Sequence, residues 1–337
     1  MNRYIYLVFG VLFLSCCGQK NATTSNHGTD ISAGSNEVNT GNAVKSPIFD
    51  ADSAYSYVAA QVAFGPRVPN SEAHKACAAY LVSELERHGA KMYIQEAVLT
   101  AYNGDRLNAK NIIGAFSPDK SRRVMLFAHW DSRPYADQDA DEANHRRPID
   151  GADDGGSGVG VLLEIARHIG ENAPEIGVDI IFFDAEDYGV PEFANKYTPD
   201  SWCLGSQFWA KNPHVPNYKA EYGILLDMVG SKGATFYKEG YSVRYASRYV
   251  ETVWATARNL GYGKYFINAN GGAVTDDHEY VIKGRGIPCI DIINLDPKNE
   301  KHGFGVHWHT MNDNMDIIDK QTLKAVGQTV LEVVYSD

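Results

Sequence analysis

Residues 124–132 read Val-Met-Leu-Phe-Ala-His-Trp-Asp-Ser, an apolar run followed directly by a histidine and, two positions later, by an aspartate. A second apolar run, residues 178–183, is interrupted only by Asp179 and leads into the acidic segment Asp184-Ala-Glu-Asp. Short apolar runs that end in polar residues are typical of buried central strands in an α/β sheet, where functional side chains gather at the carboxyl ends. We therefore expect an α/β protein whose site lies at that edge of the sheet.

Strand and helix patterns alternate along the rest of the folded part. Strands are predicted at residues 91–99, 111–115, 123–128, 178–184, 222–228 and 289–294. Helices are predicted at residues 51–64, 71–88, 158–170, 203–211, 242–260 and 320–335. This alternation predicts a three-layer α/β/α sandwich around a central mixed, mostly parallel sheet. Long polar loops usually carry function, so the pocket walls are expected in residues 133–149, 189–202 and 296–306.

Several polar segments that lie far apart in the sequence carry the residue types that bind zinc. Asp154 lies in a Gly-Ala-Asp-Asp-Gly-Gly turn, Asp187 follows the second apolar run, and His309 lies between Trp308 and Thr310. A catalytic zinc takes imidazole nitrogen and carboxylate oxygen from three protein ligands and keeps one position open. We predict a zinc site with Asp154, Asp187 and His309 as its ligands.

The residue before the second of these ligands is also acidic. Glu186 and Asp187 follow each other where a strand turns into a loop. Adjacent side chains at such a turn point in different directions, so Glu186 can face a substrate while Asp187 holds the metal. The pair therefore has the arrangement expected of a base beside a ligand.

Composition and charge narrow the class of protein. The chain has 337 residues, of which 44% are hydrophobic and 22% charged, which is ordinary for a globular protein and favours one large α/β domain. Its formal net charge is −11, and the basic pairs Arg122-Arg123 and Arg146-Arg147 form no larger cluster. Nucleic acid is therefore not an expected partner.

The first residues resemble an export signal. One positive charge at Arg3 precedes an apolar stretch, residues 4–14, that is shorter than the roughly 20 residues needed to span a bilayer. The stretch ends in Leu-Ser-Cys-Cys-Gly, which resembles a bacterial lipobox, with Cys16 or Cys17 as the acylated residue; a cleaved soluble-secretion signal is the alternative. We predict a lipoprotein signal peptide at residues 1–17, and hence an exported bacterial lipoprotein that touches the membrane only through its lipid anchor and faces the periplasm.

The part between the signal and the folded domain has a different composition. Residues 18–45 are rich in Asn, Thr, Ser and Gly, and they bury too little apolar surface to offset the entropy of ordering. We predict a flexible tether there and a catalytic domain at residues 46–337.

Plainer interpretations suit two other groups of residues. The acidic run at residues 137–142 is expected to be a solvated loop, with an incidental calcium site as the alternative. Cys77, Cys203 and Cys289 are an odd number, so at most one disulfide within the domain is possible, and we expect buried free thiols without a catalytic role.

Taken together, these segments resemble the zinc-dependent aminopeptidase superfamily, and within it the glutaminyl cyclases, from about residue 46 to the C-terminus. The superfamily shows, in fixed order, a His-x-Asp-Ser segment, a Gly-Ala-x-Asp segment, an acidic pair after a strand, a Leu-Asp-Met-Val-Gly segment and an aromatic-His-Thr segment. This chain has His129, Asp154, Glu186-Asp187, Asp227 and His309 at those places.

Two classes within the superfamily remain to be separated. A two-zinc aminopeptidase would use His129, Asp154, Asp187, Asp227 and His309 as ligands, and all five are present. Two other positions favour the cyclases: Asp276-Asp277-His278 resembles their Asp-Asp-His where aminopeptidases show Ser-Asp-His, and Trp308 replaces the usual tyrosine. Asp291 departs from the animal cyclases, which carry histidine there, so the resemblance indicates a bacterial relative of the animal type.

The resemblance implies a reaction and a role for each residue. A cyclase converts the N-terminal glutamine of peptides and exported proteins to pyroglutamate with release of ammonia, and we expect a monomer that carries one zinc ion. Glu186 would carry the proton. Asp227 and Asp276 are expected close to Glu186, where like-charge repulsion raises the proton affinity of the carboxylates, so that they share one proton. Trp308 is expected to form an apolar wall for the substrate. The alternative function is a zinc aminopeptidase that releases N-terminal residues.

Overall fold

The central sheet is built around the apolar segment at residues 124–128. The computed structural model describes residues 46–337, so the predicted signal peptide (1–17) and tether (18–45) lie outside the described residues. Strand β3 (Arg123–His129) pairs in parallel with β4 (Gly177–Phe183) on one side and with β5 (Gly223–Asp227) on the other. Every residue of β3 after the first is buried. The segment therefore forms a central strand, as predicted.

The remaining strands complete a six-stranded sheet in the order β1-β2-β4-β3-β5-β8. Strand β8 (Cys289–Ile293) pairs in parallel with β5, while β2 (Arg106–Phe116) is antiparallel to β4 and β1 (Lys91–Thr100) is antiparallel to β2. The prediction of a mixed, mostly parallel sheet is confirmed. Two short strands, β6 (Phe236–Lys238) and β7 (Phe266–Asn270), pair separately from this sheet.

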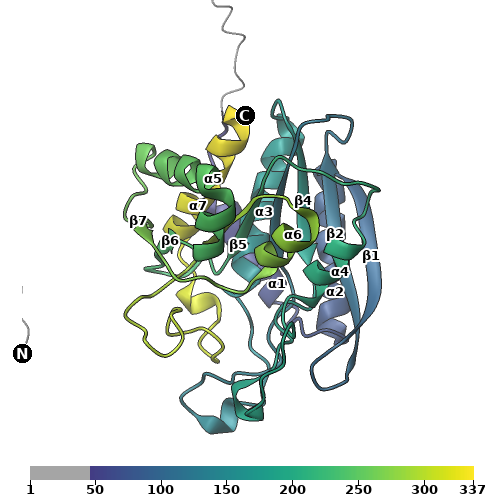
Figure 1. Cartoon of the computed structure of the whole chain (residues 1–337), viewed down its shortest axis with the longest axis vertical. Coiled ribbons are helices and arrows are strands. Elements are labelled where there is room, and N and C mark those ends of the chain that lie inside the picture. The colour runs from purple at the N-terminus through teal and green to yellow at the C-terminus, as the bar shows by residue number, and fades with distance from the viewer. Residues whose placement is uncertain (1–45) are drawn as a thin grey trace, which may run out of the picture. The chain divides into compact units, whose positions relative to one another are not determined.

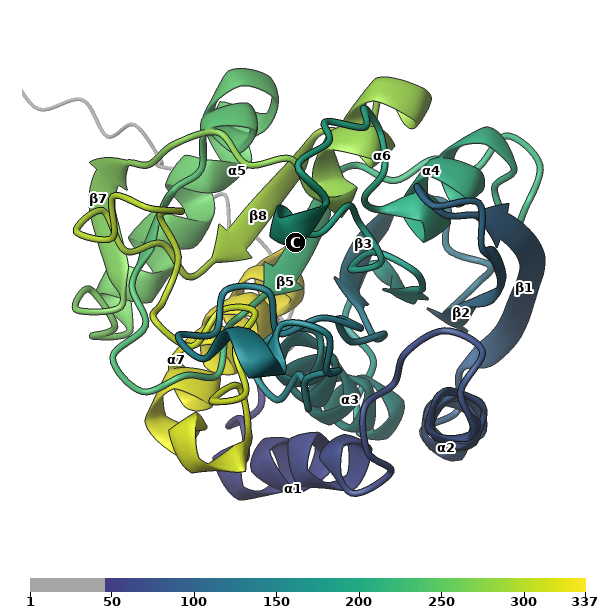
Figure 2. The same ribbon diagram turned by 90° about the horizontal axis from the view of Figure 1, so that it is seen from below.

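Helices cover both faces of the sheet (Figure 1). Their bounds are α1 (Ala51–Val62), α2 (Glu72–Arg87), α3 (Gly156–Glu171), α4 (Leu204–Lys211), α5 (Gly240–Asn259), α6 (Asp277–Arg285) and α7 (Lys320–Ser336). Figure 2 shows α1, α3 and α7 on one side of the central strands and α4 and α6 on the other. The structure is therefore the predicted three-layer α/β/α sandwich.

The side chains of β3 divide between two hydrophobic cores. Val124, Leu126 and Ala128 belong to the larger core, which includes residues of α1, α3 and α7, whereas Met125 and Phe127 belong to the smaller core beside α4 and α6. Successive side chains of a strand point to opposite faces of a sheet, so an apolar strand covered on both faces has no polar side. This division explains why the segment is apolar at every position rather than at alternate ones.

Asp179, the residue that interrupts the apolar run of β4, forms a buried ion pair. Its carboxylate accepts hydrogen bonds from the Arg123 guanidinium at 2.6 and 2.8 Å and from the Tyr218 hydroxyl at 2.7 Å. A buried charge is tolerated when it is paired and hydrogen-bonded. The interruption is therefore structural and lies at the end of β4 away from Asp184.

Apart from three short 3₁₀ helices, one α-helix and two strands were not predicted from the sequence. Helix α6 has charged residues at many of its nine positions and therefore lacks a clear apolar stripe, while β6 and β7 have three and five residues. Short elements of this kind give little periodic signal.

Within residues 46–337, no helix is long and apolar enough to cross a membrane.

Candidate metal centre and catalytic pocket

The carboxyl ends of three neighbouring strands bring the predicted site residues together. His129 is the last residue of β3, Asp227 is the last residue of β5, and the acidic pair Glu186-Asp187 follows β4. Asp154 lies directly before α3, and His309 lies in the connection from β8 to α7. Parallel strands end at the same edge of a sheet, which explains how residues far apart in sequence meet here.

The three predicted zinc ligands form one buried cluster. His309 Nε2 lies 3.2 Å from Asp187 Oδ1 and 3.5 Å from Asp154 Oδ2, and each residue is at most 3% exposed. Asp187 Oδ2 is buried and has no hydrogen-bond partner among the described residues. Two carboxylates and an imidazole nitrogen, with one oxygen unpaired, form a donor set that fits zinc.

Charge and burial around this cluster favour the metal-binding form of the histidine. Burial, together with the nearby Arg133 guanidinium, lowers the pKa of His309 well below its usual range, so the ring is neutral. Burial and repulsion by Asp154 raise the pKa of Asp187 well above its usual range. A cation between these groups would offset the repulsion between the two carboxylates.

The loop at residues 133–149 supports this cluster from behind. Arg133 pairs with Asp137 at 2.7 Å, donates to the Asp187 carbonyl at 3.0 Å and lies 3.4 Å from Asp187 Oδ1. Asp137 Oδ1 in turn lies 3.6 Å from His309 Nδ1, a charge contact beyond hydrogen-bonding distance, and this nitrogen has no hydrogen-bond partner among the described residues. Two predictions need correction here. Within the acidic run at 137–142, residues 140–142 are exposed as predicted but Asp137 is buried, and the loop at 133–149 does not line the cavity.

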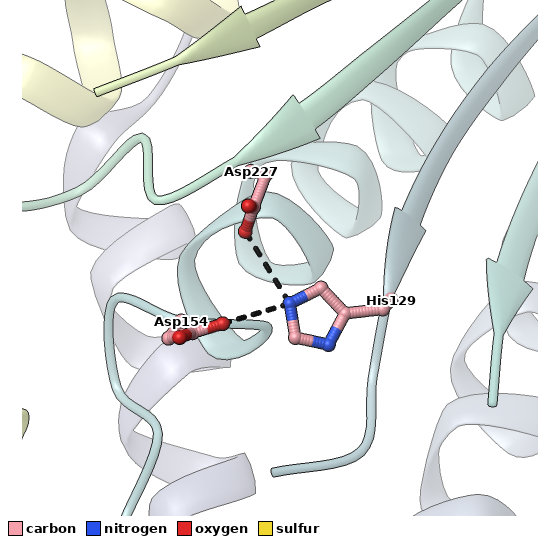
Figure 3. Close-up of side chains that lie close together, drawn as sticks. All are labelled: His129, Asp154 and Asp227. Atoms are coloured by element: carbon pink, nitrogen blue, oxygen red, sulfur yellow. Dashed lines mark hydrogen bonds and ion pairs between the residues drawn. The ribbon is translucent and has the colours of Figure 1, made fainter. Parts of the chain in front are cut away.

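A second cluster shares Asp154 with the first (Figure 3). His129 Nε2 lies 2.9 Å from Asp154 Oδ1 and 3.3 Å from Asp227 Oδ1. A side chain at Gly155 would come within 2.9 Å of the His129 ring, and this glycine has a φ of +82°. The glycine therefore gives the ring its room and starts α3 beside the two clusters.

A cavity of about 540 Å³ opens onto both clusters. Its lining includes Trp202 from the loop at 189–202 and residues 297 and 302–304 from the loop at 296–306, so these two predicted walls are confirmed. The other lining residues are Asp154, Glu186, Asp187, Asp227, Met228, residues 270–276, Ile293, Leu295, Trp308 and His309. All seven predicted site residues therefore border one space.

Glu186 lies at the wall of this cavity and has an unexpected partner. The Cys203 thiol donates a hydrogen bond to Glu186 Oε1 at 3.1 Å, and the Cys203 amide donates to the Glu186 carbonyl at 2.9 Å. Burial raises the pKa of Glu186 well above its usual range, and repulsion by Asp276 and Asp187 adds to this effect, although His129 opposes it. The three cysteines of the described residues are free and buried, as expected, but Cys203 lies in the site and no motif indicated this.

Two further acidic residues border the same space. Burial raises the pKa of Asp227 to about 7, against the opposing hydrogen bond from His129. Burial and repulsion by Asp227 raise the pKa of Asp276 to about 8. Asp276 also caps the start of α6, and its Oδ2 atom is buried without a hydrogen-bond partner among residues 46–337. The arrangement fits carboxylic acids that hold and release protons near neutral pH.

Two indole rings face the ring of His309. Trp308 stacks on it with ring centroids 3.7 Å apart, and Trp202 lies nearly parallel to it at 5.8 Å. Trp202 also carries the Arg133 guanidinium over its ring at 4.5 Å. The predicted apolar wall at Trp308 is therefore one of two, since Trp202, in the loop predicted to wall the pocket, forms the other.

Comparison with known proteins assigns the chain to a family. The family model described as Peptidase family M28 matches residues 111–334, so the chain belongs to this family. The chain is similar to a glutaminyl cyclase from Tannerella forsythia, at 73% identity and a TM-score of 0.85 over 86% of this chain and 100% of that chain. It is also similar to a Zn-dependent exopeptidase from Parabacteroides distasonis, at 71% identity and a TM-score of 0.85 over 86% and 99% of the two chains.

A curated relative agrees with the first of these structures. The glutaminyl-peptide cyclotransferase of Bos taurus is 26% identical over 298 residues, which span 79% of this chain and 77% of the bovine protein. The family, the exopeptidase neighbour and the donor set together indicate zinc as the metal for this centre.

Proposed function

We propose that this protein is a glutaminyl-peptide cyclotransferase, an enzyme that converts N-terminal glutamine to pyroglutamate and releases ammonia. The relatives named glutaminyl cyclase support this function. The observation that carries it is the placement of Glu186: its carboxylate is held by Cys203 at the wall of a cavity that also opens onto Asp154, Asp187 and His309. One proton carrier and one metal-binding set therefore face the same substrate.

We propose that one zinc ion is held by Asp154, Asp187 and His309. Bound there, it would act as a Lewis acid on the γ-carbonyl of the substrate glutamine. The reason for proposing one ion rather than two is the reaction, whose nucleophile is an amine and needs no metal-bound water. His129 Nε2 lies within hydrogen-bonding distance of both Asp154 and Asp227, so the imidazole can link these carboxylates without a second ion.

The nucleophile of the reaction belongs to the substrate. The α-amine attacks Cδ of the glutamine side chain, a five-membered ring closes and the bond from Cδ to the amide nitrogen breaks. Because the amine is tethered at ring-forming distance, no activated water is needed and proximity supplies much of the acceleration. The indoles of Trp202 and Trp308 would form apolar walls that exclude water from the side chain.

Glu186 would carry the proton between the two nitrogens. It takes one proton from the attacking amine and delivers it to the departing nitrogen, so that ammonia leaves and the carboxylate is restored. The Cys203 thiol occupies Oε1, which leaves Oε2 for the proton. Asp276, whose pKa is raised to about 8 by burial and by Asp227, would adjust the proton affinity of Glu186 by repulsion, and Asp227 would act through Asp276.

A zinc aminopeptidase is the second candidate. The cluster of His129, Asp154 and Asp227 favours it, because its ligand atoms lie within 4.8 Å of one another and share Asp154 with the first cluster. That function needs a water nucleophile between two metal ions. The two candidates therefore differ in metal count and in product, and both differences are measurable.

The first prediction concerns the metal ligands. Asp187→Ala and His309→Ala should each weaken zinc affinity by more than about 100-fold, because each removes one of three ligands, whereas His129→Ala should weaken it by roughly tenfold or less. Zinc competition with a chelator measures this for each purified variant. If His129→Ala loses zinc as readily as His309→Ala, the second cluster holds metal as well.

The second prediction concerns the product. The wild-type protein should release ammonia from glutaminyl peptides, with a cyclised product and about one zinc per chain, and should not release leucine from leucyl peptides. Both assays are run on one preparation, with zinc counted in the same sample. Release of leucine with about two zinc ions per chain would establish the aminopeptidase instead.

The third prediction concerns Asp276. Asp276→Asn should lower kcat by roughly 100-fold, within the range of acid–base effects, while the zinc content stays near the wild-type value. Asp319→Asn is the matched control, since Asp319 caps α7 in the way that Asp276 caps α6 but lies outside the cavity lining. Parallel losses of zinc and turnover in Asp276→Asn would show a structural role.

We propose, from the sequence alone, that the protein is an exported lipoprotein anchored through Cys16 or Cys17, facing the periplasm and acting as a monomer on exported proteins. Labelled palmitate should enter the wild-type protein in cells and should be lost when both cysteines are replaced by serine. A wild-type protein that takes up no label would leave a cleaved secretion signal as the explanation.

A further inference from the structure

Glu239 is a fully buried carboxylate that belongs to neither metal cluster and does not line the cavity. It caps the start of α5, where Oε1 accepts from the Tyr241 amide at 2.8 Å and Oε2 accepts from the amide and hydroxyl of Ser242, both at 2.7 Å. These bonds are what a helix cap requires. Glu239 has two further partners, and both lie in segments that form the catalytic pocket.

The first of these partners is the wall of the cavity. Glu239 Oε1 accepts a hydrogen bond from the Val274 amide at 2.9 Å, and residues 270–276 all line the cavity. The same wall is tied to the residues around Glu239 by backbone bonds: Gly240 N donates to Gly272 O at 2.9 Å and Gly271 N donates to Lys238 O at 2.7 Å. Residues 238–240 therefore hold the wall through these hydrogen bonds.

The wall also packs closely on the start of α5. A side chain on Gly240 would meet Ala273 at 2.9 Å, which is closer than side-chain contacts allow. The glycine beside Glu239 is thus required by the approach of the wall rather than by backbone conformation. Close packing and hydrogen bonds act on the same few residues.

The second partner is the helix that carries Asp276. His278 Nε2 lies 3.0 Å from Glu239 Oε2, and His278 is the second residue of α6, the helix that Asp276 caps. In addition, the Ser242 hydroxyl that donates to Glu239 accepts from the Asp291 amide at 2.9 Å, which connects β8 to the same carboxylate. Three segments around the pocket therefore meet at one side chain.

Glu239 keeps its charge in this environment. Burial alone would raise its pKa, but the hydrogen bond from His278 and those from the Ser242 and Tyr241 amides lower it to about 2. The charged form accepts five hydrogen bonds at once. A glutamine has one acceptor oxygen, so it cannot serve both the Oε1 and the Oε2 partners.

We propose that Glu239 is a positioning residue of the active site, which holds the 270–276 wall and Asp276 in place relative to Glu186. The inference rests on the proposed cyclase function, because substrate binding at the wall and proton transfer near Asp276 are what it positions. A role as a simple cap would not need the Val274 and His278 partners, as Asp50 shows: it caps α1 with two amides and a hydroxyl and touches no part of the pocket.

The test compares Glu239→Gln with Asp50→Asn on glutaminyl peptides, with the wild-type protein assayed alongside. Glu239→Gln should raise KM by roughly fivefold and lower kcat by roughly tenfold, since a misplacement of about 1 Å can reduce rates by up to 100-fold. Asp50→Asn should leave both constants within about twofold while lowering the unfolding temperature slightly. Glu239→Gln with a lowered unfolding temperature but unchanged KM would overturn the proposal, because a structural defect alone does not alter the KM of the molecules that remain folded.

Two further results keep the test decisive. If the wild-type protein does not release ammonia, the proposed function fails and the inference that rests on it fails with it, whereas unchanged constants in Glu239→Gln beside an active wild-type protein overturn the role of Glu239 alone. If Glu239→Gln does not fold, Ser242→Ala is used, because it removes one hydroxyl from the network and keeps every backbone donor. It should lower kcat/KM by about threefold and also lower the unfolding temperature, because the buried Asp291 amide loses its acceptor. A change in kcat/KM below about twofold would overturn the proposal.

Discussion

The structure depends on holding several carboxylates together in a place with little water. Asp154, Glu186, Asp187, Asp227 and Asp276 border one cavity, and burial and mutual repulsion raise the pKa values of most of them. Such a group is unfavourable unless cations or hydrogen-bond donors compensate it. Much of the surrounding architecture supplies that compensation, and the remainder is left for a metal ion.

The compensation comes from rigid elements behind the cavity. Arg133 reaches Asp187 and is itself fixed by Asp137, while Asp131 accepts hydrogen bonds from the amides of Glu186 and Asp187 at 3.1 and 3.2 Å. Backbone strain occurs at the same places, since Ala185, Met228 and His309 have positive φ values and each adjoins or is a site residue. Strained conformations of this kind persist where packing over-determines them and where a side chain must be aimed.

The sequence predicted the elements that have a periodic or continuous apolar pattern and the residues that lie in motifs. The apolar runs located β3 and β4, and the motifs located Asp154, Asp187 and His309, which meet at one cavity, because strand ends and metal-binding segments both leave a local signature. Cys203, Asp137 and Glu239 were missed for a common reason. Each acts through a partner distant in sequence, so its role exists only after the chain has folded. No local sequence pattern distinguishes such a cysteine, aspartate or glutamate beforehand.

The geometry of His129 bears on how one fold serves two chemistries. His129 Nε2 lies 2.9 Å from Asp154 Oδ1 and 3.3 Å from Asp227 Oδ1, which is close enough either for a hydrogen bond or for the three groups to hold an ion together (Figure 3). An N–H on this nitrogen, donated to the two oxygens, would take over the charge-balancing task of a second cation. In the proposed one-zinc enzyme Asp227 is not a ligand, and it instead repels Asp276, which in turn repels Glu186. A reaction whose nucleophile is the substrate's own amine has no need of a second metal ion to activate water, so one ion is sufficient for the proposed function.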